Sequence, residues 1–177
     1  MDKQEFWKII DSSFYESQHN TSIQEEIILD KLLNYSTEQI VEFEIIFRQL
    51  IIELDDFKIL AAEKIIEGEV SDDSYLYFRC WLIGQGEKTF TETLKNPDYL
   101  ADFVNKETFS EFEELMYVAT TAFEQKTGKQ EDDNFPRSIA DKKGISYDFN
   151  TPPTKGTDWK VEELPKLYPK LWAKFES

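Results

Sequence analysis

Apolar residues recur at the spacing of an α-helix through most of the first 127 residues. Asp2 can cap the first helix and Glu5 completes a capping-box spacing, ahead of an inward stripe made of Phe6, Ile9, Ile10, Ser13 and Phe14. Ser22 and Ser36 are each followed three residues later by Glu or Gln, the same signal. The pattern therefore predicts three successive capped helices at the N-terminal end of the chain.

Further helical elements are predicted in residues 55–68, 71–86, 87–94, 96–103 and 111–126. Gly68 suits the end of the first of these, and Gly84 with Gly86 breaks the second. Ser110 is expected to cap the last, a long helix that runs to about Lys126.

Residues 128–177 have a different pattern, with all but one of the six prolines and no long periodic run. They are nevertheless too apolar for a disordered tail, since they contain Phe135, Ile139, Tyr147, Phe149, Trp159, Leu164, Leu167, Tyr168, Leu171, Trp172 and Phe175. A short terminal helix through LWAKF is also predicted. We expect an all-α, single-domain bundle of about seven helices (residues 1–127, the body), with an irregular, partly extended C-terminal segment (residues 128–177) packed across it.

Charge narrows the choice of partner. The formal net charge is -16, and the excess lies in the body, which has 11 Lys or Arg against 27 Asp or Glu, whereas the C-terminal segment has 9 of each. Such a field repels DNA, RNA and anionic membranes, because phosphate binding depends on Lys and Arg. The charge excludes nucleic acid and membrane as expected partners and favours a basic protein.

The N-terminal residues mix acids into the apolar pattern, unlike a secretory signal, and no apolar run is long enough to cross a membrane. We therefore expect a cytoplasmic protein. The single cysteine, Cys80, cannot form an intramolecular disulfide and is predicted to be a small core residue.

The stretch SDDSYLYFRCWLIGQG, residues 71–86, is apolar in nearly every direction around its helix, which is typical of a buried helix. Ser71 is predicted to cap it. Arg79 lies among aromatics, where an unpaired charge is costly, so it is expected to pair with a carboxylate or, alternatively, to hold a ligand's carboxylate or phosphate in a cleft. The candidate ligand-binding residues are Asp72, Asp73, Tyr75, Arg79 and Trp81.

Other chemistry is sparse in this sequence. The lone histidine, His19, lies in a polar link and is expected to be an exposed surface residue. No zinc, serine-hydrolase or phosphate-loop motif occurs, so no catalytic residue, metal or cofactor is predicted.

The run SDDSYLYFRCWLIGQGEKTFTETLKNPDYLAD closely resembles the bacterial family of proteins of unknown function DUF4240. The start, FWKIIDSS, and the end, with Gly156, Trp159 and LPKLYPKLW, are also similar to that family, so the resemblance extends over essentially the whole chain. It implies a bacterial, cytoplasmic, helical protein and transfers no catalytic residue.

Three classes of function remain open. The first is a non-catalytic acidic protein-binding or regulatory module, for instance an immunity-like partner of a basic effector. The second is a sensor of a small anion or small molecule, built on Arg79 and the neighbouring aromatics. The third is an enzyme that uses carboxylates such as Asp72 and Asp73, with or without a metal.

Overall fold

The computed structural model describes residues 1–148 and 151–175, and it is all-α over that range, as predicted. An isolated bridge between Asp56 and Lys155 is the extent of β-type pairing in the described residues. The helices, more numerous than the seven or so expected, are α1 (Lys3–Glu16), α2 (Thr21–Leu32), α3 (Thr37–Glu53), α4 (Phe57–Glu67), α5 (Asp72–Gly84), α6 (Glu87–Lys95), α7 (Val118–Thr127), α8 (Pro136–Lys142), α9 (Leu164–Leu167) and α10 (Pro169–Phe175), together with the 3-10 helices η1 (Pro97–Asp102), η2 (Glu113–Met116) and η3 (Val161–Glu163).

Most of the predicted caps are present. Asp2 accepts a hydrogen bond from the Glu5 amide, and Ser36 with Gln39 forms a capping box. The cap expected at Ser22 is wrong, because Asn20 accepts from the amide of Ile23 and starts α2 two residues earlier. Local spacing was ambiguous there, since Asn20 and Ser22 are both good capping residues.

The predicted start of the long helix after Ser110 is also wrong. Ser110 is buried and donates to Glu67, and residues 110–112 are not helical. The amide of Phe112 instead donates to the carbonyl of Tyr77 in α5, at 3.2 Å, while its ring packs beside Gly84. This tertiary contact delays the α-helix to Val118, and α7 then ends at Gly128 in a left-handed conformation, as predicted.

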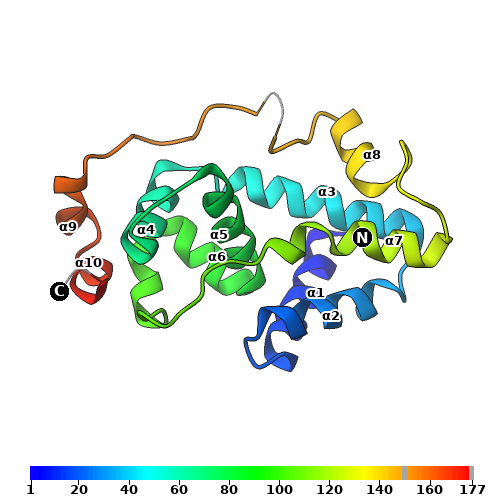
Figure 1. The fold of residues 1–177 in the computed structure, drawn as a ribbon, viewed down its shortest axis with the longest axis horizontal. Coiled ribbons are helices and arrows are strands. Elements are labelled where there is room, and N and C mark those ends of the chain that lie inside the picture. The colour runs from blue at the N-terminus through cyan, green and yellow to red at the C-terminus, as the bar shows by residue number, and fades with distance from the viewer. Residues whose placement is uncertain (149–150, 176–177) are drawn as a thin grey trace.

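The core joins residues of the body to residues of the C-terminal segment. α3 packs against α7 and α8, α1 lies beside α2, and α10 contacts α4 and η1 (Figure 1). Of the predicted anchors in the C-terminal segment, Leu167 is exposed, Ile139 is partly buried but outside the core, and Phe149 lies outside the described residues. The core contains or contacts Phe135, Tyr147, Trp159, Leu164, Tyr168, Leu171, Trp172 and Phe175.

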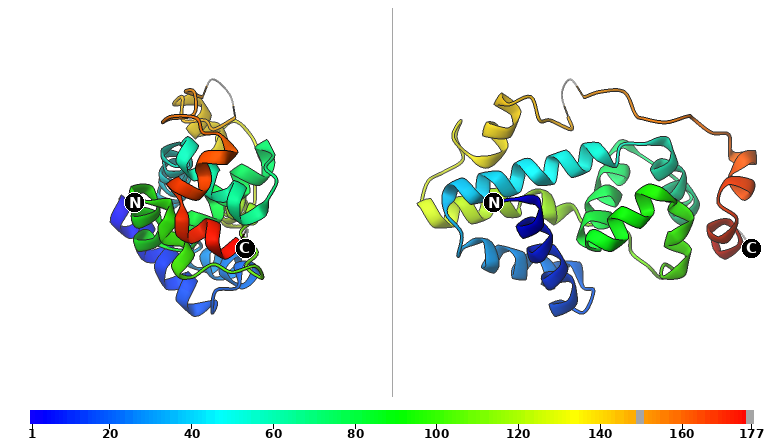
Figure 2. Two further views of the ribbon diagram at one scale, coloured as in Figure 1. Left: turned by 90° about the vertical axis from the view of Figure 1, so that its left-hand side faces the viewer. Right: turned by 180° about the vertical axis from the view of Figure 1, so that it is seen from behind.

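The C-terminal segment runs along the body from α8 to the opposite end of the molecule, where α9 and α10 lie (Figures 1 and 2). Its extended middle part is fixed at the α3–α4 junction. Lys155 exchanges backbone hydrogen bonds with Asp55 and Phe57, at 3.1 and 2.9 Å, and Trp159 Nε1 donates to the Phe57 carbonyl at 2.7 Å. Helix α8, which starts at Pro136, was not predicted, because it is too short to show a recognisable helical period.

The buried carboxylate of Asp98 in η1 holds the last helix. Its two oxygens accept hydrogen bonds from the backbone amides of Lys170 and Leu171, at 3.2 and 2.9 Å, at the start of α10. We expect Asp98→Ala to cost about 1–2 kcal/mol of unfolding free energy, because two amides lose their acceptor.

Urea denaturation and limited proteolysis of α9 and α10 measure this effect. Asp102→Ala is the matched control, since Asp102 is exposed and only 3.6 Å from Lys170 Nζ in a surface ion pair, and we expect it to change stability by less than about 0.5 kcal/mol. Equal stability of the two variants would show that Asp98 does not hold α10.

Candidate functional site

Helix α5 is a core element, as the sequence pattern predicted. Ser71 caps it through a reciprocal capping box with Ser74. Among the apolar side chains expected in the core, the structure buries Tyr75, Phe78, Cys80, Trp81, Leu82 and Ile83. Burial also raises the pKa of the Cys80 thiol, which keeps it protonated and unreactive.

Arg79 is 8% exposed, but the carboxylate partner predicted for it is absent from the ion pairs of the described residues. Its Nε donates to the Tyr75 carbonyl at 3.3 Å and its Nη1 to the Ile51 carbonyl at 3.2 Å. The guanidinium also lies over the Tyr75 ring, 4.4 Å from the centroid. Backbone carbonyls and a π-face therefore replace the expected counter-charge, an arrangement that sequence spacing does not reveal.

The five predicted ligand-binding residues do not form one site. Asp72 and Tyr75 line a hollow of about 380 Å³ beside Trp159, and Arg79 lines a cavity of about 50 Å³ beneath the C-terminal segment. Trp81 faces a third and larger space, and Asp73 is exposed. Side chains on one buried helix point in different directions, which separates them in space.

The larger space is an open groove of about 720 Å³. Its walls come from the end of α1 and the link to α2, from the C-terminal end of α5, and from the loop after η1. We call it the aromatic groove after its lining residues Phe14, Tyr15, Trp81, Phe103 and Phe109. Tyr15 and Phe109 are 73% and 71% exposed, although large apolar side chains usually avoid water.

The polar link between α1 and α2 shapes one wall of this groove. Gln18 and His19 both have positive φ angles, 52° and 70°, which non-glycine residues rarely adopt. His19 is exposed, as expected, but its ring stacks on Phe14 at a centroid distance of 4.3 Å with an interplanar angle of 4°. Only the tertiary structure assigns His19 to a hollow surface.

Carboxylates lie at this groove. Glu114 is part of its wall. The pKa of Glu25 on α2 is raised, first by partial burial and then by the negative charges of Glu114 and Glu26, so Glu25 lies close enough to Glu114 to add negative charge near this wall. A concentrated negative charge next to exposed aromatic rings is suited to a cation.

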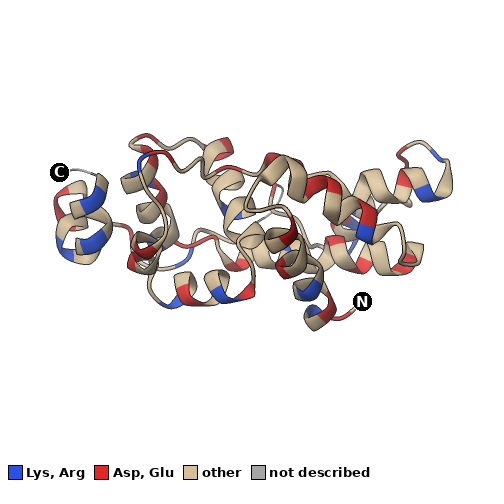
Figure 3. Cartoon of the chain, turned by 90° about the horizontal axis from the view of Figure 1, so that it is seen from below, with Lys and Arg blue, Asp and Glu red and all other residues tan. Residues whose placement is uncertain are grey.

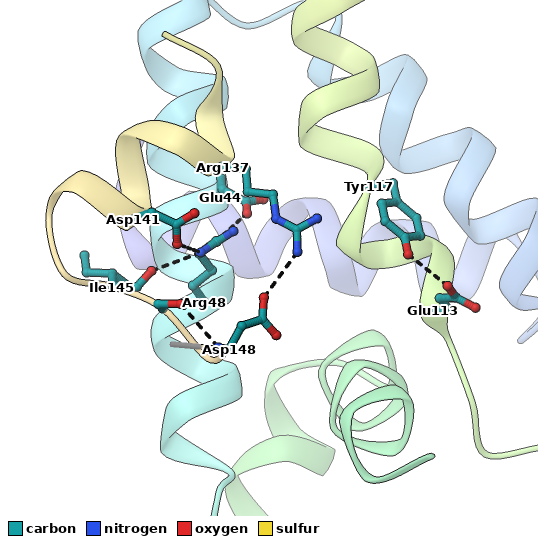
Figure 4. A network of polar contacts seen from close by, with 9 residues as sticks. Glu44, Arg48, Glu113, Tyr117, Arg137, Asp141, Ile145 and Asp148 are labelled. Atoms are coloured by element: carbon teal, nitrogen blue, oxygen red, sulfur yellow. Dashed lines mark hydrogen bonds and ion pairs between the residues drawn. The ribbon is translucent and has the colours of Figure 1, made fainter. Parts of the chain in front are cut away.

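A second cluster, missed by sequence reasoning, fastens α8 to α3 (Figure 4). Arg48 is fully buried, and its Nε donates to Glu44 and its Nη1 to Asp141, each at 2.6 Å. Burial raises the pKa of Glu44, and the charge of Arg48 opposes that rise. Arg137, on α8, pairs with the half-exposed Asp148 at 3.3 Å.

Glu63 on α4 is the other buried charge that the sequence did not reveal. It is 0% exposed, and neither carboxylate oxygen has a hydrogen-bond partner in the described part of the chain. The nearby Ser74 hydroxyl donates to the Ser71 carbonyl instead. Burial is the main cause that raises the pKa of Glu63 from 4.5 to about 7.

Within the residues that the structure describes, no group of three or more His, Cys, Asp or Glu side chains is placed to hold a metal ion. The same residues include no helix both long and apolar enough to span a bilayer. The described side chains with shifted pKa values are scattered through the core and the surface.

The fold is that of an all-α protein with an acidic body and a C-terminal segment packed against it, and the candidate site on its surface is the aromatic groove. The chain belongs to the family described as a protein of unknown function, DUF4240, whose family model matches residues 1–125. The resemblance expected for residues 126–177, including Trp159 and LPKLYPKLW, lies outside the matched range. No curated protein and no solved structure matches the chain significantly.

Proposed function

We propose that this protein is a non-catalytic, acidic binding or regulatory module, and that it holds a basic segment of another protein in the aromatic groove. The observation that carries the proposal is the coincidence of exposed aromatic rings and the Glu114 carboxylate at one open groove of about 720 Å³. Aromatic residues are enriched at the centres of protein interfaces, and their faces attract Lys and Arg side chains.

The distribution of charge supports a basic partner. Acidic residues are spread over the helices of the body, whereas lysines gather near α9 and α10, at the end occupied by the C-terminus (Figure 3). The body carries 27 acidic against 11 basic side chains, which would steer a cationic protein toward the groove. An immunity-like or regulatory role toward a basic effector fits this chemistry, and the family resemblance with the buried free Cys80 supports a bacterial, cytoplasmic setting.

The groove predicts binding of a short cationic peptide, such as octa-arginine, with a change in tryptophan fluorescence because Trp81 is part of the wall. Affinity should fall steeply as salt rises from about 0.05 to about 0.5 M, since the Debye length shortens over that range. Phe109→Ala and Glu114→Lys should each weaken binding by roughly fivefold or more, because they remove one aromatic face or reverse one charge.

Glu162→Lys is the matched control, because it makes the same charge change on the exposed η3 helix, outside the groove lining. If Glu162→Lys and Glu114→Lys weaken the peptide equally, binding depends on net charge alone and the groove is not the site. Circular dichroism of each variant verifies that the helices remain folded.

A further inference from the structure

The small cavity beneath the C-terminal segment is separate from the aromatic groove. It lies between α3, α5 and the extended chain, and its lining includes Arg79, Tyr147, Lys155 and Asp55. Its volume of about 50 Å³ exceeds the roughly 10–15 Å³ that one water molecule requires. The space is therefore large enough for a small ion.

Arg79 contributes a positive charge that has no ion-pair partner among the described residues. A guanidinium has five N–H donors, and the hydrogen bonds of Arg79 use its Nε and Nη1, both to backbone carbonyls. Its Nη2 makes no hydrogen bond within residues 1–148 and 151–175 and is not fully buried, so it is available to a ligand. Glu63 is near enough for Arg79 to lower its pKa but is not ion-paired with it. Burying such a charge without a counter-ion is costly.

Tyr147 adds an unused donor. Its hydroxyl is buried and has no hydrogen-bond partner in the described chain, and its ring lies 4.9 Å from the guanidinium carbon of Arg48. Buried donors normally find an acceptor, so the unpaired Tyr147 hydroxyl in the lining of this cavity is a free donor for a ligand.

We propose that the cavity is a binding site for a small oxyanion, a phosphate-like or short carboxylate anion, held by Arg79 Nη2 and the Tyr147 hydroxyl. The guanidinium fork matches the oxygen spacing of both anions. Lys155, whose Nζ donates to the Glu53 carbonyl at 2.6 Å, adds positive charge at the edge, and Asp55 opposes binding. The C-terminal segment covers the site, so a bound anion would link that segment to α5.

Thermal denaturation and isothermal titration test the site with sodium phosphate, sulfate and acetate, each compared with chloride at a constant ionic strength of about 0.15 M. We expect one or more of these oxyanions to raise the midpoint temperature of unfolding of the wild-type protein, because a ligand that binds the folded state stabilises that state. The net charge of -16 disfavours general anion binding, which makes a positive shift specific. Phosphate and sulfate acting without acetate identify a tetrahedral anion, whereas acetate acting alone identifies a carboxylate.

Two variants test the site while leaving the buried Arg79 side chain in place. Tyr147→Phe removes only the unpaired hydroxyl. It should lower the affinity for the anion by roughly tenfold or more, since it removes a hydrogen bond to a charged group. Asp55→Asn should raise the affinity for the anion by roughly a few-fold, because it removes a nearby negative charge that repels the anion. Tyr117→Phe is the control, because the Tyr117 hydroxyl donates to Glu113 at 2.9 Å and Tyr117 is not part of the cavity lining.

The site would be supported if Tyr147→Phe lowers the affinity for the anion, Asp55→Asn raises it, and Tyr117→Phe leaves it unchanged. An anion effect of equal size in all three variants would place binding elsewhere and overturn the proposal. Absence of any oxyanion effect in the wild-type protein would also overturn it. Peptide binding at the aromatic groove is measured separately, so the two proposals can fail independently.

Discussion

Arg48→Met is expected to lower the free energy of unfolding by about 3–5 kcal/mol at pH 7, a large part of the 5–15 kcal/mol typical of a folded protein. The substitution leaves Glu44, which is 1% exposed, without the guanidinium that pairs with it at 2.6 Å. It also removes the bond from Arg48 to Asp141 that joins α3 to α8 (Figure 4). Urea denaturation followed by circular dichroism measures the loss.

The cost should depend on pH, with a sign that follows from Glu44. Burial already raises the pKa of this carboxyl, and loss of the Arg48 charge raises it further, because that charge favours the ionised form. The penalty of the variant should therefore shrink as pH falls and Glu44 takes up a proton. Glu44→Met combined with Arg48→Met should recover much of the stability, since a well-packed apolar pair often replaces a buried ion pair.

Arg137→Met provides the matched control on α8. Arg137 and its partner Asp148 are each 35% exposed, so their ion pair is screened by water. We expect a loss of less than about 1 kcal/mol. A loss as large as that of Arg48→Met would contradict the view that burial sets the cost.

Glu63→Gln is expected to stabilise the protein at pH 8 by about 3 kcal/mol. The folded state binds a proton on Glu63 more tightly than the unfolded chain does, because burial raises the pKa from 4.5 to about 7. Wild-type stability should therefore fall as pH rises from about 4.5 to about 7 and then level off, as linkage requires. The glutamine is neutral and of similar shape, so it removes that dependence.

The measurement is urea denaturation of both proteins at intervals between about pH 4.5 and 8, where the gain should grow from near zero. Glu69→Gln is the control, because Glu69 is exposed and the same substitution there should change stability by less than about 0.5 kcal/mol. A constant difference between Glu63→Gln and wild type across this pH range would show that Glu63 does not titrate on folding.

The helical fold follows from information within a few residues of chain. The capping box at Ser36 needs only Gln39, and the end of α4 needs only Gly68 with its positive φ. Such local rules predicted the helices of the body well. They failed at Ser110, where the bond from Phe112 to the Tyr77 carbonyl outweighs the local preference for a helix.

The candidate site was predicted only in part, because Trp81 alone among the five residues proposed from sequence lines the aromatic groove. The groove joins the α1–α2 link to Phe103 and Phe109, which lie more than 80 positions further along the chain. The exposure of Phe109 is a property of the folded surface. No pattern of three to four residues can show it.

By itself, the sequence determined the helical class, most helix ends, the burial of α5 and the acidity of the body, since each depends on composition or on neighbours along the chain. Only the tertiary structure decided which charges are buried and what they contact. Arg48 meets Asp141 across 93 positions, and Arg79 meets the Ile51 carbonyl across 28. Long-range packing removes the two guanidinium groups from water, and the loss of solvation then determines the partners they require.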